Sequence, residues 1–149
     1  MRFDTVIFDL DGTLTDSGPG IRNAVRHALK KYGIEENDKS KLNRFIGPPL
    51  HDSFTRFYGI CPEEAEKGEN YFREYYRDIG IFENSVYDGI TDCLENLKKA
   101  GAKLYIATSK PDFMADAVLS HFDLKKYFTS VCGADVENGI RTKTAVLGL

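Results

Sequence analysis

Hydrophobic residues along the chain follow two kinds of spacing, and the spacing changes twice. A short apolar run at residues 5–8 has the length of a strand. From about residue 16 to residue 82, apolar positions recur every three or four residues, which predicts helices and no strand. After residue 82, helix-like and strand-like segments alternate. We therefore predict an α/β protein with a helical block inserted after the first strand.

The helices expected in the middle block begin and end at recognisable residues. Pro19 suits the first turn of a helix that Gly33 closes, and Ser17 is a candidate to cap that helix. Aromatic residues concentrate in the last helix of the block, where we expect them to form the core of a helical subdomain. The expected helices span about residues 19–32, 39–45, 49–58 and 62–78.

The final block predicts a parallel sheet, because strand-like and helix-like segments follow one another in turn. This alternation is typical of a doubly wound, Rossmann-like sheet, in which ligands bind beyond the carboxyl ends of the strands. We place the α/β core at residues 1–15 and 83–149, and the helical insertion at residues 16–82. The expected elements of the final block are strands at 103–107 and 128–133 and helices at 88–100 and 112–122.

Composition indicates an ordinary soluble globular protein. The 149 residues are 42% hydrophobic and 29% charged, and a formal net charge of -3 offers no broad basic surface for nucleic acid. No apolar run approaches the roughly 20 residues of a membrane helix, and the acidic residue Asp4 lies too close to the N-terminus for a signal peptide. We therefore expect a cytoplasmic protein that does not bind membranes. Cys61, Cys93 and Cys132 lack a zinc-like spacing and are expected to be buried thiols.

The first strand runs directly into two carboxylates. Asp9 and Asp11 follow Phe8 at alternate positions, so an extended backbone turns both side chains to one side, and Gly12 lets the chain turn away. Like charges so close require a cation or a shared proton, and oxygen-rich sites of this kind suit Mg²⁺. An ordinary turn is the alternative. Taken alone, an Asp-x-Asp-Gly segment is more often a loop than a site, and a phosphoryl-transfer site with Asp9 as the nucleophile is the hypothesis that the longer sequence string around it supports.

A second candidate site follows the strand at 103–107. That strand ends in Thr108 and Ser109, at the sheet edge where Asp9 is expected. The Thr108 hydroxyl and the Ser109 amide are suited to hydrogen-bond a phosphate. The alternative is a side chain that caps the next helix.

A third candidate is a cation. Lys143 precedes a short apolar turn, and phosphoryl transfer needs positive charge to balance the transferring group. The alternative for a single lysine is a solvated surface position. Lys110 is a competing cation, and Arg141 is a weaker candidate.

Together these segments resemble the haloacid dehalogenase (HAD) superfamily, and in particular its phosphoglycolate phosphatase-like hydrolases with a helical cap. VIFDLDGTLTDS resembles the first signature of these aspartate-nucleophile phosphatases, IATSKP the second and RTKTAVL the third. The resemblance implies that Asp9 is the nucleophile and that Asp11 is the general acid and base. It also implies that Thr108, Ser109 and Lys143 bind the phosphate. Mg²⁺ would be held by an Asp9 carboxylate oxygen and the main-chain carbonyl of Asp11.

The resemblance gives the helical insertion a role as well. It implies a cap that closes over the site and excludes water. Gly47, Pro48 and Pro49 would then form a substrate-specificity loop. Read without the resemblance, these three residues break a helix.

One family signature has no counterpart. The fourth, an acidic pair after another strand that completes the Mg²⁺ site, is not found before Leu149. In the family that strand pairs beside the first one, so residues 6–8 should present an unpaired edge. We expect the sequence to be the N-terminal portion of a longer protein, with low Mg²⁺ affinity and weak activity when isolated. Robust Mg²⁺-dependent turnover by these 149 residues would contradict this expectation.

The resulting hypothesis is a Mg²⁺-dependent phosphatase that hydrolyses a small phosphorylated metabolite through an aspartyl-phosphate. A phosphomutase of the β-phosphoglucomutase type stays open because it shares the catalytic pair, and so does a non-catalytic phosphate-binding fragment because the fourth signature is missing. Dehalogenation is disfavoured, since dehalogenases need no acid at the position of Asp11, and phosphonate hydrolysis is disfavoured too. Phosphoglycolate, pyrophosphate, nucleoside monophosphates and sugar phosphates all fit a cap of this size, and the sequence leaves the oligomeric state open.

Overall fold

The computed structural model describes residues 3–135, 139–140 and 146. The chain divides into two compact units: unit 1 comprises Met1–Asp16 and Ser85–Leu149, and unit 2 comprises Ser17–Asn84. The boundaries fall after residues 16 and 84, where the sequence placed them after residues 15 and 82.

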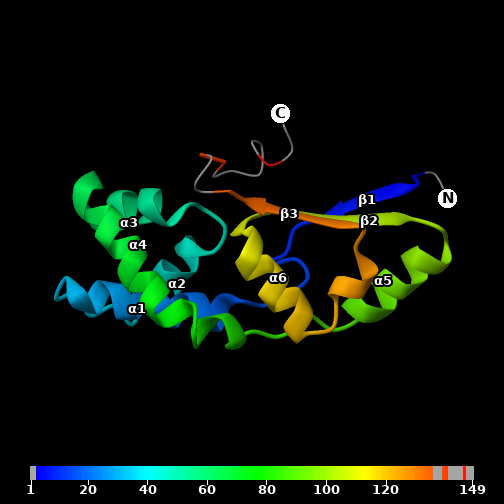
Figure 1. The fold of residues 1–149 in the computed structure, drawn as a ribbon. Coiled ribbons are helices and arrows are strands. Elements are labelled where there is room, and N and C mark those ends of the chain that lie inside the picture. Colours follow the sequence, from blue (N-terminus) through cyan, green and yellow to red (C-terminus); the bar gives the residue numbers. More distant parts are fainter. Residues whose placement is uncertain (1–2, 136–138, 141–145, 147–149) are drawn as a thin grey trace. The chain divides into compact units, whose positions relative to one another are not determined.

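A three-stranded parallel sheet in the order β1-β2-β3 forms the centre of unit 1 (Figure 1). Phe8 lies opposite Ile106, which lies opposite Val131, so the carboxyl ends of the strands share one edge. This confirms the predicted α/β fold with a parallel sheet. The strands are β1 (Thr5–Phe8), β2 (Lys103–Pro111) and β3 (Ser130–Ala134).

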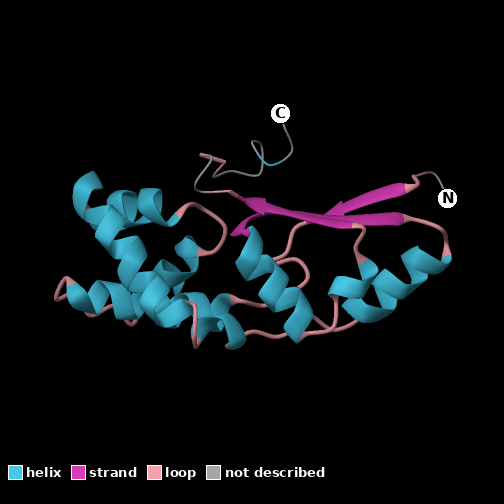
Figure 2. Ribbon diagram, viewed as in Figure 1, coloured by secondary structure: helices cyan, strands magenta, loops and turns pink. Residues whose placement is uncertain are grey.

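The two α-helices described in unit 1 lie on the same side of the sheet (Figure 2). They are α5 (Ile90–Lys99), between β1 and β2, and α6 (Asp112–His121), between β2 and β3; a short 3-10 helix, η3 (Lys125–Tyr127), precedes β3. Both crossovers step in the same direction along the sheet, and right-handed connections therefore bring both helices to one face. The core beneath them includes the fully buried Leu94, Leu104 and Leu119.

Strand β1 lies at an edge of the sheet. Within the described residues it pairs with β2 alone, as expected for residues 6–8. Phe3 and Ile7 are 66% and 54% exposed. An unpaired apolar edge of this kind is a template for pairing with a further strand.

Unit 2 is helical throughout its described residues. Helix α1 buries the predicted apolar face, which includes Ala24, Val25 and Leu29, and packs mainly against α4. Phe72 and Tyr76 of α4 are buried and stack with ring centroids 5.0 Å apart, so the aromatic residues do contribute to the core. The elements are α1 (Gly18–Lys31), α2 (Lys39–Leu42), η1 (Asn43–Phe45), α3 (Leu50–Tyr58), α4 (Pro62–Tyr76) and η2 (Gly80–Phe82).

Several local predictions were wrong. Ser17 occupies the position before α1 but does not cap it, since its hydroxyl is buried without a hydrogen-bond partner among the described residues. The helix expected at 39–45 tightens into a 3-10 turn after Leu42. Strand β2 continues beyond Ala107 to Pro111, because its end meets β3 again after an irregularity in the pairing.

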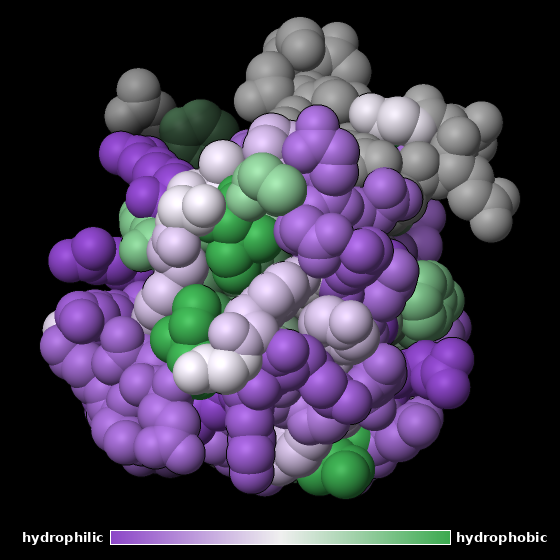
Figure 3. Space-filling model, turned by 90° about the vertical axis from the view of Figure 1, so that its left-hand side faces the viewer, coloured by the Kyte–Doolittle hydropathy of each residue, from purple (hydrophilic) through white to green (hydrophobic). Residues whose placement is uncertain are grey.

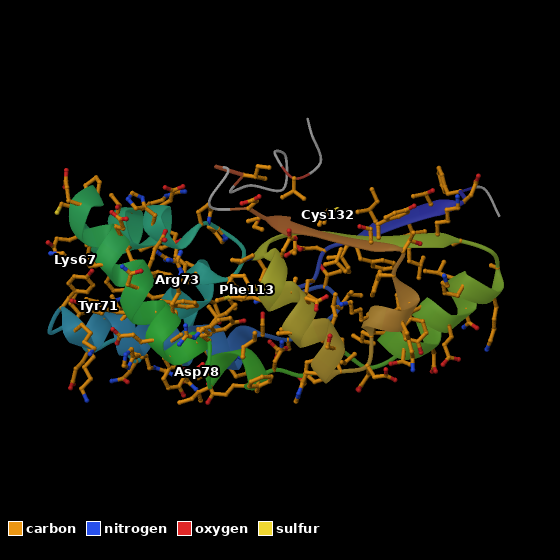
Figure 4. All side chains as sticks on the ribbon, in the orientation of Figure 1. Lys67, Tyr71, Arg73, Asp78, Phe113 and Cys132 are labelled. Atoms are coloured by element: carbon orange, nitrogen blue, oxygen red, sulfur yellow. The ribbon has the colours of Figure 1, made fainter. Side chains whose placement is uncertain are left out.

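The cysteines were also placed wrongly. Cys61, Cys93 and Cys132 are all exposed free thiols, and Cys132 lies on β3 (Figure 4). Their apolar character predicted burial, but Cys61 precedes α4, while Cys93 lies on a face of α5 that the core does not cover. Thiol packing therefore contributes little to this core.

No helix in the described ranges has the length and apolar character that crossing a membrane requires. The face shown in Figure 3 is mostly hydrophilic, with small separate groups of hydrophobic residues. An ordinary solvated surface accounts for this pattern.

The core of unit 2 provides a first test. Phe54 is fully buried and packs edge-to-face against Phe45, with the ring centroids 5.1 Å apart. Phe57 on the same helix is only partly buried. We expect Phe54→Ala to lower the free energy of unfolding by about 3–5 kcal/mol, because it leaves a cavity. Phe57→Ala should cost clearly less. Urea unfolding of both variants measures this, and equal losses would contradict the packing described.

Candidate functional site

A tight turn holds the two carboxylates that follow β1. The Leu14 amide donates to the Leu10 carbonyl at 2.9 Å, and the Gly12 amide donates to the Thr15 carbonyl at 2.8 Å. Gly12 has a φ of 76°, which glycine adopts without strain. Leu10 and Leu14 are fully buried and anchor the turn in the core. Buried leucines thus fix the backbone from which the carboxylates project.

Asp9 is oriented by its own neighbour. The Leu10 amide donates to Asp9 Oδ1 at 2.8 Å. Because Leu10 is buried, this amide cannot turn toward solvent, and the carboxylate is restrained in rotation. A restrained carboxylate suits a nucleophile, since less freedom is lost on reaching the reactive geometry.

The second predicted segment lies at the same edge of the sheet. Ile106 on β2 pairs with Phe8 on β1, and Thr108 lies two residues after Ile106. The Thr108 side chain is buried. Its Oγ1 accepts a hydrogen bond from the Lys110 amide at 3.2 Å. Helix α6 is preceded by Pro111 and has no side-chain cap, so Thr108 and Ser109 do not serve as its cap. This excludes the capping alternative for the segment.

A bulge sets these residues apart from the β2–β3 ladder. Ala107 pairs with Cys132, and Pro111 pairs with Ala134, so four steps along β2 match two along β3. The residues between them leave the regular pairing, and bulges of this kind often re-aim side chains beside active sites. The bulge therefore presents Thr108–Lys110 at the strand end.

Strand β3 supports the bulge by close contact. A Cβ on Gly133 would lie 2.5 Å from the Lys110 carbonyl oxygen and 2.7 Å from the Asp112 amide nitrogen. Only glycine allows this approach. The Gly133 amide also donates to Asp112 Oδ1 at the start of α6. The next residue of α6, Phe113, is 64% exposed (Figure 4).

An ion pair joins the two strand ends. Lys110 Nζ lies 3.0 Å from Asp11 Oδ2, and the two side chains are only 5% and 15% exposed. Asp11 Oδ1 is buried and has no hydrogen-bond partner among the described residues. A buried lysine thus balances the charge of Asp11.

The structure therefore joins Asp11 and Lys110 directly, and the strand register places Asp9 and Thr108 at the same edge of the sheet, with the half-buried Ser109 between Thr108 and Lys110. Sequence reasoning named Lys110 only as a competing cation. The sequence signal was its position two residues after Thr108 at a strand end, but the bulge and the strand register that bring Lys110 to Asp11 are properties of the tertiary structure.

The other predicted cations, Lys143 and Arg141, lie outside the described residues. The predicted specificity residues Gly47, Pro48 and Pro49 lie in unit 2, between η1 and α3. Gly47 has a φ of 102°, and the Ser53 hydroxyl donates to the Pro49 carbonyl at 3.0 Å. The segment does break the helical chain, and its role in substrate choice stays a prediction.

Unit 2 has a polar cluster around Glu36. Glu36 accepts hydrogen bonds from the Asp38 amide at 2.9 Å and the Tyr58 hydroxyl at 3.1 Å, and it pairs with Lys41 at 3.4 Å. These contacts, the Asp38 amide foremost, lower the pKa of Glu36, while burial and the Glu36 carboxylate raise the pKa of Tyr58 to about 12. A cavity of about 330 Å³ beside the cluster is lined by Lys41, Arg44, Phe57 and Tyr58.

Comparison with known proteins identifies the family. Residues 6–144 match the model of the haloacid dehalogenase-like hydrolases. The chain belongs to this family. A predicted phosphatase from Clostridium acetobutylicum has the same fold, with a TM-score of 0.93 and 43% identity over 98% of this chain and 68% of that one.

Three relatives show how names vary within the HAD family. A Pseudomonas aeruginosa protein named 5'-nucleotidase is 42% identical over 95% of this chain and 64% of its own length. The tyrosine-protein kinase PtkA of Mycobacterium tuberculosis is 39% identical, over 95% of this chain and 48% of its own. Phosphoglycolate phosphatase 1 of P. aeruginosa is 33% identical over 87% of this chain and 50% of its own length. The chain thus spans about half to two thirds of these relatives.

The buried ion pair makes a prediction about stability. Lys110→Met should lower the free energy of unfolding by roughly 3–5 kcal/mol, because it leaves the Asp11 charge buried and unpaired. Adding Asp11→Asn should recover much of that loss. Lys99→Met, which breaks an exposed pair with Glu95, should cost at most about 1 kcal/mol. Denaturant unfolding of the three variants and the wild type measures these free energies, and equal effects at Lys110 and Lys99 would contradict burial of the pair.

Proposed function

We propose that this HAD chain carries the phosphoryl-transfer site of a phosphatase that hydrolyses a small phosphate monoester through an aspartyl-phosphate. The observation that carries the proposal is the ion pair between Asp11, in the turn that also holds Asp9, and the buried Lys110, which lies near the buried Thr108 at the end of β2. Family membership and relatives named 5'-nucleotidase and phosphoglycolate phosphatase support it.

In the first step Asp9 attacks. A carboxylate oxygen of Asp9 bonds to phosphorus, the bond to the ester oxygen breaks, and the leaving alkoxide takes a proton from Oδ1 of Asp11, which enters this step in its protonated form with Oδ2 on Lys110. The Leu10 amide restrains the Asp9 carboxylate before attack. In the second step water attacks the same phosphorus, the bond from phosphorus to Asp9 breaks, and the Asp11 carboxylate takes one proton of the water.

Hydroxyl and amide groups at the end of β2 stabilise the phosphate. The oxygen of the Thr108 hydroxyl already accepts from the Lys110 amide, so its hydrogen is available to donate. The Ser109 amide lies in the bulge, away from the regular ladder. Lys143 is proposed from the family resemblance as a further phosphate ligand.

The residues present fit a Mg²⁺ site with few protein ligands. No group of three or more His, Cys, Asp or Glu side chains that could hold a metal occurs in the described ranges. Mg²⁺ commonly uses one or two carboxylates and keeps water and phosphate oxygens as its other ligands. The Asp9 carboxylate and the Asp11 main-chain carbonyl would hold it, while the Asp11 carboxylate stays on Lys110. When bound, Mg²⁺ would offset negative charge on the phosphate.

The relatives suggest which substrates to try first. The relative named 5'-nucleotidase favours a nucleoside monophosphate, and the relative named phosphoglycolate phosphatase favours phosphoglycolate. The similarity to PtkA supports transfer to a tyrosine hydroxyl as a second candidate, because an aspartyl-phosphate can pass its phosphoryl group to an alcohol as well as to water.

Loss of the nucleophile tests the mechanism. Asp9→Asn should reduce phosphate release from an aryl phosphate on the order of 10⁴-fold, because the amide cannot form the covalent intermediate. Asp4→Asn, an exposed position just before β1, is the matched control and should retain activity. Full activity in Asp9→Asn protein that is folded would show that the covalent scheme is wrong.

Product analysis distinguishes the phosphatase from its alternatives. We expect inorganic phosphate from a nucleoside 5'-monophosphate or phosphoglycolate, with added Mg²⁺. Conversion of a sugar phosphate into its isomer without free phosphate would favour a mutase. Phosphotyrosine formed from ATP and a tyrosine peptide would favour the kinase activity.

A further inference from the structure

Lys110 lies in an unusual position for a lysine. Its side chain is 5% exposed and its ammonium group is 3.0 Å from one oxygen of Asp11. Lysine is rarely buried unless it is paired, and here the pairing is with a residue of the proposed chemistry. Lys110 therefore requires an explanation within the site.

The two oxygens of Asp11 have different surroundings. Oδ2 is held by Lys110, whereas Oδ1 is buried and meets no hydrogen-bond donor among the described residues. A buried carboxylate oxygen without a partner is costly, and such atoms in native proteins commonly have a functional reason. Oδ1 is suited to a donor that enters the site during the reaction.

The backbone makes this arrangement rigid. The bulge between Ala107 and Pro111 directs Lys110 toward Asp11, and Gly133 packs against the Lys110 carbonyl oxygen. The Lys110 amide is itself tied to the Thr108 hydroxyl at 3.2 Å. Rotation of the Asp11 carboxylate would break the ion pair, so Lys110 decides which oxygen is presented.

We propose that Lys110 is a positioning residue for the second half-reaction, in which it holds Asp11 Oδ2 so that Oδ1 accepts the proton of the hydrolytic water. The inference rests on the proposed function. In this step the water oxygen bonds to phosphorus, the bond from phosphorus to Asp9 breaks, and Asp9 regains its carboxylate. One water proton moves to Asp11 Oδ1.

A direct phosphate-binding role for Lys110 makes a different prediction. A lysine that binds phosphate would contribute to substrate affinity, so its loss would raise KM and the inhibition constant of inorganic phosphate. A lysine that positions Asp11 would leave both nearly unchanged and would slow one chemical step. The two roles are separated by asking which step Lys110→Met affects.

The experiment uses p-nitrophenyl phosphate, whose leaving group departs without a proton, so that formation of the aspartyl-phosphate does not need Asp11. In Lys110→Met we expect a burst of about one equivalent of p-nitrophenol, accumulation of phosphoenzyme, and hydrolysis of that intermediate slowed on the order of 10²-fold. Rapid chemical quench with radiolabelled substrate measures the phosphoenzyme.

Four further variants complete the design. Asp11→Asn should show the same burst, and adding Lys110→Met to it should slow hydrolysis no further, because both changes act on one step. Lys110→Arg should restore part of the hydrolysis rate. Lys99→Met, which breaks an exposed ion pair, should behave as wild type.

The outcomes separate the positioning role from the proposed function. Two results for Lys110→Met would overturn the positioning role and leave the phosphatase intact. One is a phosphoenzyme that accumulates and hydrolyses as in wild type. The other is a raised KM with no change in phosphoenzyme hydrolysis. Absence of both phosphoenzyme and phosphate release in the full-length wild-type protein would overturn the proposed function and the positioning role together. Folding of each variant is checked by circular dichroism, and the double variant, which carries no unpaired charge, keeps the test valid if Lys110→Met alone is unstable.

Discussion

The contact between Lys110 and Asp11 connects two parts of the chain that are nearly a hundred residues apart in sequence. One partner comes from the turn after β1 and the other from the bulge at the end of β2. Neither charge is tolerated alone at this depth, so each requires the other to be in place. The turn, the bulge and the glycine of β3 behind it together form one supported unit around the carboxylates.

The sheet explains why this contact is possible. Parallel pairing of β1 with β2 brings the carboxyl ends of both strands to one edge, and each strand leaves polar residues there. Leu10 and Leu14 hold the first segment in the core, while Gly133 lets β3 approach the second. Apolar packing and close backbone approach therefore determine the polar geometry of the site. Catalytic constellations are preorganised by such support.

Membership of the HAD family agrees with this geometry. Relatives with names as different as nucleotidase, phosphoglycolate phosphatase and tyrosine kinase share much of this chain. Under the proposed function, a common phosphoryl-transfer site with different acceptors and leaving groups would account for that range. We expect the helical unit, with its loop at Gly47–Pro49, to contribute to the difference.

Periodicity alone predicted the parallel α/β sheet, the helices of unit 2 and the segments that hold Asp9, Asp11 and Thr108, because strand alternation and helical spacing are local properties. Local patterns misplaced the cysteines and the cap at Ser17, since exposure depends on which faces the rest of the chain covers. The partner of Asp11 was decided by tertiary structure. Several cations were available in the sequence, and only the strand register and the bulge bring Lys110 within 3.0 Å of that carboxylate.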